Sequence, residues 1–183
     1  MRVIGGEFRS RRLKSVAGDA TRPTPDRLRE TLFDILATRI EGATFADAYA
    51  GTGAVGIEAL SRGAAHAYFL EKNRVALGAI RENLESLKLG ARATVVSGPV
   101  ARTIGRWRAD IVFVDPPYGL EREYAAVLAA LAASPPPIAI VQHSVHFTLP
   151  EAGGLEHTRE VRQGDNVLSF FVPAAQKGVW SRS

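Results

Sequence analysis

The 183-residue sequence contains no cysteine. This absence excludes disulfide frameworks, zinc ribbons and iron–sulfur clusters, together with any mechanism that needs a cysteine nucleophile. Long hydrophobic runs are also missing: the longest, from Tyr124 to Ala133, is about half of the ~20 residues that a membrane-spanning helix requires. The residues after Met1 lack the apolar stretch of a signal peptide. We therefore expect a cytoplasmic protein that makes no membrane contact.

The composition fits one folded domain with an unevenly placed charge. Hydrophobic residues make up 46% of the chain and charged residues 23%, so a full core is possible. The first thirty residues hold eight basic and four acidic side chains, whereas the remainder holds 15 of each. The formal net charge of +4 therefore belongs to the N-terminal segment. A basic segment on a neutral body indicates a polyanionic partner, although a solvated tail has the same composition.

Helix-like and strand-like segments alternate from Pro25 onward. Thr24-Pro25-Asp26 predicts a helix start, and Gly42 predicts the end of that helix. Alternation of this kind predicts an α/β fold with a doubly wound, mostly parallel sheet, and the final segments predict a β-hairpin that adds an antiparallel edge. We expect strands at 44–49, 67–70, 93–96, 111–114 and 138–141, helices at 54–62, 73–89 and 121–132, and a hairpin of 156–162 with 167–172. In helix 73–89 the expected core positions are Val75, Leu77, Ile80, Leu84 and Leu87.

A glycine-rich loop follows the first of these strands. Gly51-x-Gly53-x-x-Gly56 matches the dinucleotide-binding fingerprint, and Glu71 follows about 20 residues after Gly51, where an acid binds ribose hydroxyls. Two kinds of enzyme share this pattern: those that bind nicotinamide or flavin cofactors and those that bind S-adenosylmethionine. Asp47 favours the second, because a carboxylate suits the cationic amino acid end of S-adenosylmethionine and repels pyrophosphate.

The buried strand at 111–114 runs directly into Asp115-Pro116-Pro117-Tyr118. Prolines restrict the backbone and leave the carbonyl groups free to accept hydrogen bonds. The Asp115 carboxylate and the Pro116 carbonyl can hold the two hydrogens of an exocyclic base amine, while Tyr118 can stack on a flipped base. The sequence therefore predicts direct methyl transfer to a nucleobase amine, without a covalent enzyme intermediate and without a metal.

These motifs together resemble the class I S-adenosylmethionine-dependent amino-methyltransferases of nucleic acids. More narrowly, the chain resembles the bacterial 16S rRNA guanine-N2 methyltransferases of the small-subunit methyltransferase D type. That resemblance extends to the segments 4–13, 22–30, 56–64 and 164–170, which are IGGEFRSRRL, RPTPDRLRE, GIEALSRGA and GDNVLSF. It implies the seven-stranded Rossmann-like fold of class I methyltransferases with a small N-terminal β-hairpin extension. It also implies methylation of one guanine N2 in 16S rRNA within the small ribosomal subunit, with S-adenosylhomocysteine as the second product.

The resemblance also implies roles for individual residues. The catalytic loop is Asp115, Pro116, Pro117 and Tyr118. The expected cofactor-binding residues are Asp47, Tyr49, Ala50, Gly51, Thr52, Gly53, Glu71, Lys72, Ser97, Gly98, Pro99 and Asp115. Family members often carry an acid after the third strand, and the segment 96–100 of this chain has none, so contacts to adenine are expected from the backbone or from Ser97. The expected RNA-binding residues are Arg2, Arg9, Arg11, Arg12, Lys14, Arg22 and Thr24.

Other readings stay open at this point. The acceptor loop alone does not distinguish guanine N2 from adenine N6, so a DNA or RNA adenine methyltransferase is an alternative. A nicotinamide-dependent oxidoreductase and a non-catalytic RNA-binding module are further alternatives of other classes. We expect a basic hairpin or arm at residues 1–24, a methyltransferase domain at 25–173 and a flexible tail at 174–183.

Overall fold

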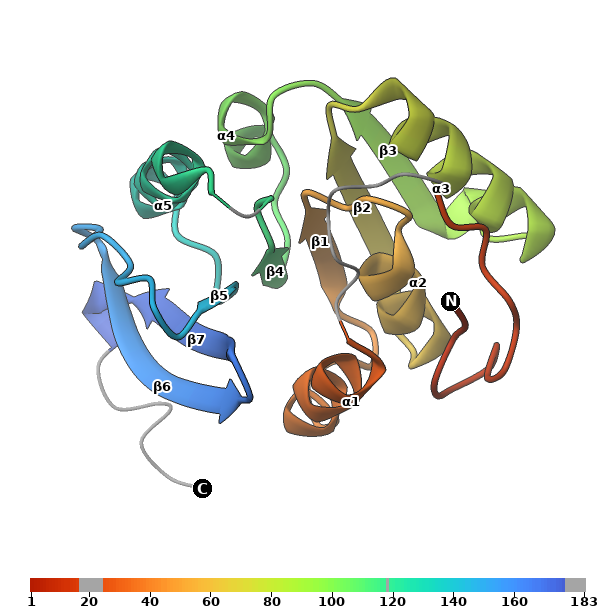
Figure 1. Cartoon of the computed structure of the whole chain (residues 1–183), viewed down its shortest axis with the longest axis horizontal. Helices are drawn as coiled ribbons and strands as arrows, with labels where there is room; N and C mark the ends of the chain where they lie inside the picture. The colour runs from red at the N-terminus through yellow and green to blue at the C-terminus, as the bar shows by residue number, and fades with distance from the viewer. Residues whose placement is uncertain (17–24, 118, 177–183) are drawn as a thin grey trace.

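The computed structural model describes residues 1–16, 25–117 and 119–176. A seven-stranded sheet with the order β3-β2-β1-β4-β5-β7-β6 forms its centre (Figure 1). The strands β1 to β5 run parallel to one another, and β7 is antiparallel to both β5 and β6. This is the α/β architecture that the sequence predicts, including the antiparallel hairpin at one edge.

The elements lie close to their predicted positions. The strands are β1 Thr44–Ala48, β2 His66–Glu71, β3 Ala93–Ser97, β4 Ile111–Val114, β5 Ile138–Ser144, β6 Leu155–Gln163 and β7 Asn166–Pro173. The helices are α1 Asp26–Ile35, α2 Ala54–Ser61, α3 Arg74–Ser86, α4 Val100–Thr103 and α5 Glu121–Ala133. Within the described residues, none of the helices combines the length and apolar character needed to cross a membrane.

Two hydrophobic cores lie on opposite faces of the sheet. In β4, Ile111 and Phe113 belong to the core that also contains residues of α1, α2 and α3, whereas Val112 and Val114 belong to the core of α4 and α5. Successive side chains of a strand point to opposite faces, so a strand covered on both sides is apolar throughout. This explains why β4 reads as a continuous apolar run and why its limits could be predicted from the sequence.

Two local predictions are wrong. The first helix ends at Ile35 instead of near Gly42, and residues 36–39 continue as turns. Leu36 and Ile40 are nevertheless buried, because the turns return them to the same core. Val75 is 64% exposed although a core position was expected. Since a helix turns by about 100° per residue, Val75 lies almost opposite Leu77, which does face the core.

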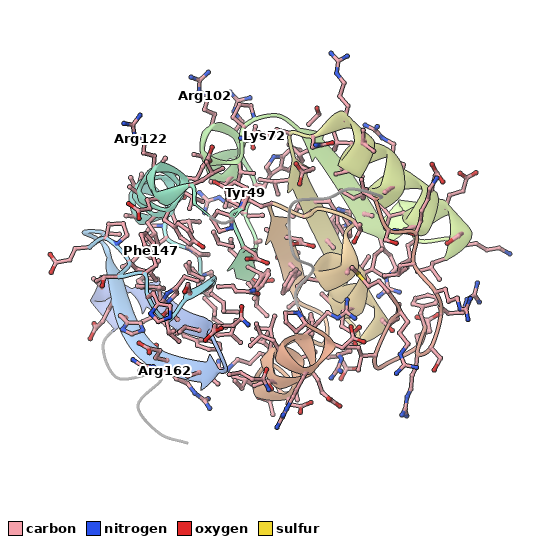
Figure 2. All side chains as sticks on the ribbon, viewed as in Figure 1. Tyr49, Lys72, Arg102, Arg122, Phe147 and Arg162 are labelled. Carbon is pink, nitrogen blue, oxygen red and sulfur yellow. The ribbon has the colours of Figure 1, made fainter. Side chains whose placement is uncertain are left out.

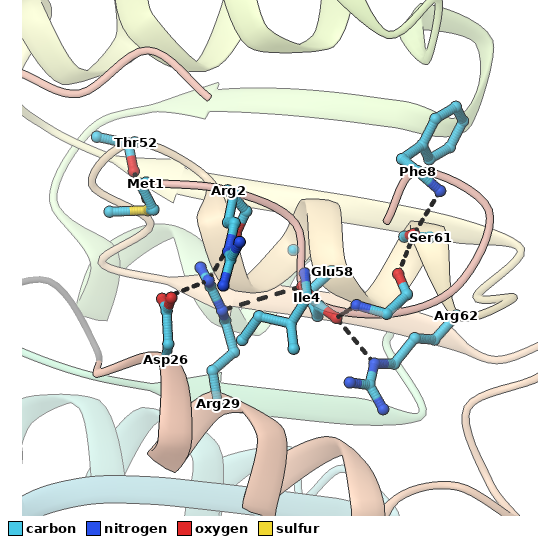
Figure 3. Close-up of polar contacts among 12 residues, drawn as sticks. Met1, Arg2, Ile4, Phe8, Asp26, Arg29, Thr52, Glu58, Ser61 and Arg62 are labelled. Atoms are coloured by element: carbon cyan, nitrogen blue, oxygen red, sulfur yellow. Dashed lines mark hydrogen bonds and ion pairs between the residues drawn. The ribbon is translucent and has the colours of Figure 1, made fainter. Parts of the chain in front are cut away.

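The N-terminal residues 1–16 pack onto the domain. An isolated antiparallel bridge joins Arg2 to Arg12 and closes this segment into a hairpin-like loop. Glu58 of α2 is fully buried, and its carboxylate accepts hydrogen bonds at 2.8 Å from the backbone N–H groups of both Ile4 and Gly5 (Figure 3). A buried carboxylate is stable only with such partners. The segment is therefore held by the same helix that follows the glycine-rich loop.

Candidate functional site

The candidate site lies at the carboxyl edge of the parallel strands. The strand order reverses between β1 and β4, and in open α/β sheets such a reversal leaves a crevice where ligands bind. Backbone hydrogen bonds connect the loops at this edge. Tyr49 N–H donates to the Leu70 carbonyl at 3.0 Å, Gly98 N–H to the Glu71 carbonyl at 3.0 Å, and Asp115 N–H to the Ala48 carbonyl at 3.3 Å. The expected cofactor and acceptor loops are thus brought together.

The glycines of the β1–α2 loop have two different functions. Gly51 has a φ of +54°, and a Cβ built on it meets nothing within 4 Å, so the backbone is open to an approaching ligand there. Gly56, inside α2, lies against the ring of Phe69 on β2. A Cβ at Gly56 would stand 2.4 Å from Phe69 Cε1. Gly56 therefore allows close packing of the helix on the sheet, whereas Gly51 leaves room at the edge.

Glu71, the expected ribose-binding acid, organises two loops. Its Oε2 accepts a hydrogen bond from Gly51 N–H at 2.9 Å, and its Oε1 accepts from Lys72 N–H and Asn73 N–H, both at 2.8 Å. A carboxylate has about four acceptor positions, so it can accept further hydrogen bonds from a ligand. Glu71 thus fixes the glycine-rich loop relative to the end of β2.

Asp47 is the most strongly perturbed acid of the site. It is 2% exposed at the end of β1, and its Oδ2 accepts a hydrogen bond from Gly56 N–H at 2.8 Å. Burial, together with the nearby charges of Asp115 and Glu71, raises the pKa of Asp47 to about 8, against the opposing effect of the Gly56 hydrogen bond. A cationic ligand at this edge would restore the ionised form.

The acceptor loop continues from β4 at the same edge. Asp115 and Pro117 are half-buried, and Pro116 is buried. Tyr118 lies outside the described residues, as do Arg22 and Thr24 of the expected RNA-binding set. The backbone of Asp115 is held beside the end of β1 through the hydrogen bond of its N–H to the Ala48 carbonyl.

Several expected cofactor residues have neighbours that the sequence did not predict. The Tyr49 hydroxyl donates to Glu123 Oε2 at 2.8 Å, and Lys72 Nζ lies 3.3 Å from Glu123 Oε1. Thr52 Oγ1 donates to the sulfur of Met1 at 3.6 Å (Figure 3), so this hydroxyl points toward the N-terminal segment. Sequence reasoning missed Glu123. Its position in the first helical turn after the acceptor loop was the signal available.

The remaining expected cofactor residues occupy backbone positions of the same loops. Ala50 N–H donates to the Leu70 carbonyl at 3.1 Å, and Gly53 is the N-cap of α2 with a φ of 80°. Ser97 ends β3 and is exposed, Gly98 follows it, and Pro99 is the N-cap of α4. The backbone of these residues therefore lies at the carboxyl edge of the sheet, in the loops that follow β1 and β3.

Exposed arginines occur on several parts of the surface, and two of these parts bear on the expected RNA contacts. Arg2, Arg9, Arg11 and Arg12 of the N-terminal segment are exposed, whereas Lys14 forms an ion pair with Glu82. Arg102 of α4 and Arg122 of α5 point outward at the edge where Tyr49 and Lys72 lie (Figure 2). The sequence did not predict a role for these two arginines, because α4 and α5 lie side by side only in the fold.

The histidines do not gather into a metal site. Within residues 1–16, 25–117 and 119–176, no three of the side chains His, Asp and Glu are close enough to hold a metal ion. His143 is buried at the end of β5, where its Nε2 lies 2.8 Å from Ser169 Oγ. Burial lowers the pKa of His143, which favours the neutral ring. It lines a separate hollow of about 710 Å³ between β6, β7 and the loop after β5.

The strand order, the glycine-rich loop and the acid at the end of β2 define a class I methyltransferase fold, the class that the sequence motifs resemble. A family model described as conserved hypothetical protein 95 matches residues 1–172, and the chain belongs to this family. The chain is 34% identical over 183 residues to the candidate rRNA methyltransferase YlbH of Bacillus subtilis, and this match covers 93% of this chain and 98% of that protein.

Two further relatives agree with this assignment. The chain is 43% identical over 119 residues to ribosomal RNA small subunit methyltransferase D of Escherichia coli. That match covers 64% of this chain and 60% of that protein. The solved structure of the candidate methyltransferase yhhF from Escherichia coli superposes with a TM-score of 0.80 at 35% identity, and covers 96% of this chain and 99% of that one. The family resemblance inferred from the sequence is confirmed. None of these relatives supports the nicotinamide alternative, because each is named as a methyltransferase or a candidate one.

Proposed function

We propose that this protein transfers a methyl group from S-adenosylmethionine to the exocyclic N2 amine of a guanine in 16S rRNA of the small ribosomal subunit. The observation that carries the proposal is the position of Asp115, half-buried at the end of β4 and bonded through its N–H to the end of β1. An acceptor for amine hydrogens therefore lies beside the loop expected to bind the cofactor. The names of two relatives, which specify rRNA, support the choice of substrate.

The residues at the edge fit S-adenosylmethionine. Gly51 leaves open space at the end of the sheet, and the carboxyl group of Asp47 suits an ammonium group, because a cationic ligand favours its ionised form. Glu71 retains acceptor capacity for ribose hydroxyls. When bound there, S-adenosylmethionine supplies an electrophilic methyl group.

The acceptor loop prepares the base amine for attack. The Asp115 carboxylate and the Pro116 carbonyl accept its two hydrogens, which orients the nitrogen lone pair and stabilises the positive charge that develops on nitrogen. The two proline rings restrict the backbone that carries this carbonyl. The arginines of the N-terminal segment contact RNA phosphates, which positions the strand without selecting the base.

The proposal is tested by transfer of tritiated methyl groups into small ribosomal subunits, naked 16S rRNA and duplex DNA, followed by mass identification of the product nucleoside. N2-methylguanosine in rRNA supports it. N6-methyladenine in any of these substrates would replace it with the adenine alternative, and binding of NADH without S-adenosylmethionine would overturn it.

Replacement of Asp115 by alanine gives a matched test of mechanism. We expect Asp115→Ala to lower kcat by about 100-fold or more while the affinity for S-adenosylmethionine changes little, because the lost acceptor acts on the base. Asp165→Ala, at an exposed carboxylate in the β6–β7 turn, is the control and should keep wild-type kcat. Equal activity of the two variants would show that Asp115 does not hold the amine.

A further inference from the structure

Glu123 connects three segments at the carboxyl edge of the sheet. It lies in the first turn of α5, directly after the acceptor loop. Its Oε2 accepts the hydrogen bond from the Tyr49 hydroxyl at 2.8 Å, and its Oε1 lies 3.3 Å from Lys72 Nζ. Tyr49 belongs to the β1–α2 loop, and Lys72 directly follows Glu71. One carboxylate therefore bridges both expected cofactor loops to the helix that carries the acceptor loop.

Tyr49 adopts a backbone conformation that needs external support. Its φ is +65°, in the left-handed region that bulky side chains rarely occupy. Such conformations persist when surrounding contacts hold them. The Tyr49 N–H is fixed to the Leu70 carbonyl at 3.0 Å, and Glu123 fixes the far end of the side chain. Hydrogen bonds thus hold both the backbone N–H and the side-chain hydroxyl of Tyr49, and these two contacts fix the loop.

The Tyr49–Glu123 contact is better protected from water than the Lys72–Glu123 ion pair. Tyr49 is half-buried, and burial together with the Glu123 hydrogen bond raises the pKa of its hydroxyl, so Tyr49 remains the proton donor. The Lys72 side chain is 50% exposed, and exposed ion pairs contribute little because water screens them. We therefore expect Glu123 to hold the cofactor loop mainly by its hydrogen bond to Tyr49.

We propose that Glu123 is a positioning residue that keeps the cofactor loop and the acceptor loop in register for methyl transfer. This inference rests on the proposed function. In-line transfer requires the methyl carbon and the attacking nitrogen to be held at a fixed separation, and a shift of about 1 Å costs about 100-fold in rate. A hydrogen bond across the two loops sets that separation before the substrates arrive.

The chain offers matched variants to test this role. Glu123→Ala removes both contacts, Tyr49→Phe removes only the hydroxyl, and Glu123→Gln keeps an oxygen that can accept the Tyr49 hydrogen bond. Glu121→Ala is the control, because Glu121 is an exposed acid in the same helical turn. We expect Glu123→Ala and Tyr49→Phe each to lower kcat by about tenfold to 100-fold, with less than a roughly threefold change in KM for RNA. Glu123→Gln and Glu121→Ala should stay near wild type.

Two measurements separate positioning from a general loss of structure. If the residues act through one contact, the double variant Glu123→Ala with Tyr49→Phe loses no more activity than either single variant. Amide hydrogen exchange of residues 49–53 in the ligand-free protein should accelerate in Glu123→Ala and not in Glu121→Ala. Unchanged exchange, additive losses in activity, or losses explained by a lower folded fraction would overturn the proposal.

The exchange measurement also separates this inference from the proposed function. If the wild-type protein methylates neither RNA nor DNA, the proposed function fails, whereas faster exchange in Glu123→Ala would still establish that Glu123 holds the loop. If wild-type transfer occurs and Glu123→Ala has wild-type kcat and exchange, the inference fails and the proposed function stands.

Discussion

Asp47 and Glu71 show how surroundings give two carboxylates at neighbouring strand ends different chemistry. Glu71 is half-buried and accepts three backbone N–H groups, whereas Asp47 is 2% exposed and accepts one. The cost of burying charge therefore dominates at Asp47, whose pKa rises from 3.8 to about 8. Between these two values the folded protein retains a proton that the unfolded chain releases, so Asp47 makes stability fall as pH rises through this window.

At this residue scale we predict that binding of S-adenosylmethionine releases protons. A cationic ligand favours the ionised form of Asp47, so the logarithm of the affinity should rise by up to about one per pH unit as the pH rises toward about 8, the pKa of Asp47. Calorimetry in two buffers of different ionisation enthalpy measures the proton release. Asp47→Asn, which keeps an acceptor for Gly56 N–H, should flatten the pH dependence. The same slope in both proteins would show that another group titrates.

At the scale of elements, the sequence predicted which segments form helices and strands better than it predicted which residues at their ends face the core. The limits of β4 are as expected, because an apolar run covered on both faces leaves little ambiguity. The short α4 was not predicted, since four residues carry no measurable periodicity. In α3 the exposed Val75 shows that apolar residues at a helix start need not face the core. Local pattern thus defines elements, and packing decides the orientation of their ends.

The contact of α2 with β2 gives a prediction at this scale. Gly56→Ala should destabilise the protein by about 1–3 kcal/mol, because the new Cβ would stand 2.4 Å from the Phe69 ring. Gly78→Ala in α3 is the control: its Cβ meets nothing within 4 Å, so higher helix propensity should stabilise by about 0.5–1 kcal/mol. Denaturant unfolding measures both changes. A stabilising effect of Gly56→Ala would mean that Phe69 moves aside at little cost.

At the scale of the whole molecule, positive charge concentrates in a segment that is packed instead of free. Glu58 holds the backbone of Ile4 and Gly5, while Arg2, Arg9, Arg11 and Arg12 remain exposed. Binding RNA through a preformed surface costs less ordering entropy than binding through a free tail. Under the proposed function, the segment would therefore hold RNA at a fixed distance from the carboxyl edge.

This arrangement predicts the salt dependence of RNA binding. If about five phosphates are neutralised, the logarithm of the affinity for single-stranded RNA should fall with the logarithm of salt concentration at a slope of about −3.5. Replacing Arg9 and Arg11 by glutamine should make the slope shallower by about 1.4. Arg159 and Arg162, exposed on β6, provide the control pair, and their replacement by glutamine should leave the slope unchanged. If both pairs of replacements changed the slope equally, the RNA would not bind specifically at the N-terminal segment.

The sequence by itself determined the fold class and predicted a cofactor loop and an acceptor loop, because each depends on neighbouring residues: alternating apolar segments, glycines with special backbone freedom, and an acid followed by two prolines. Only the tertiary structure decided which side chains support these loops. Tyr49 and Glu123 stand 74 positions apart, and Glu58 binds Gly5 across 53 positions. Burial of Asp47 likewise depends on β4 and α2 packing around β1. Contacts of this kind carry no local signature, since folding alone brings the partners together and removes the water that would otherwise surround their charges.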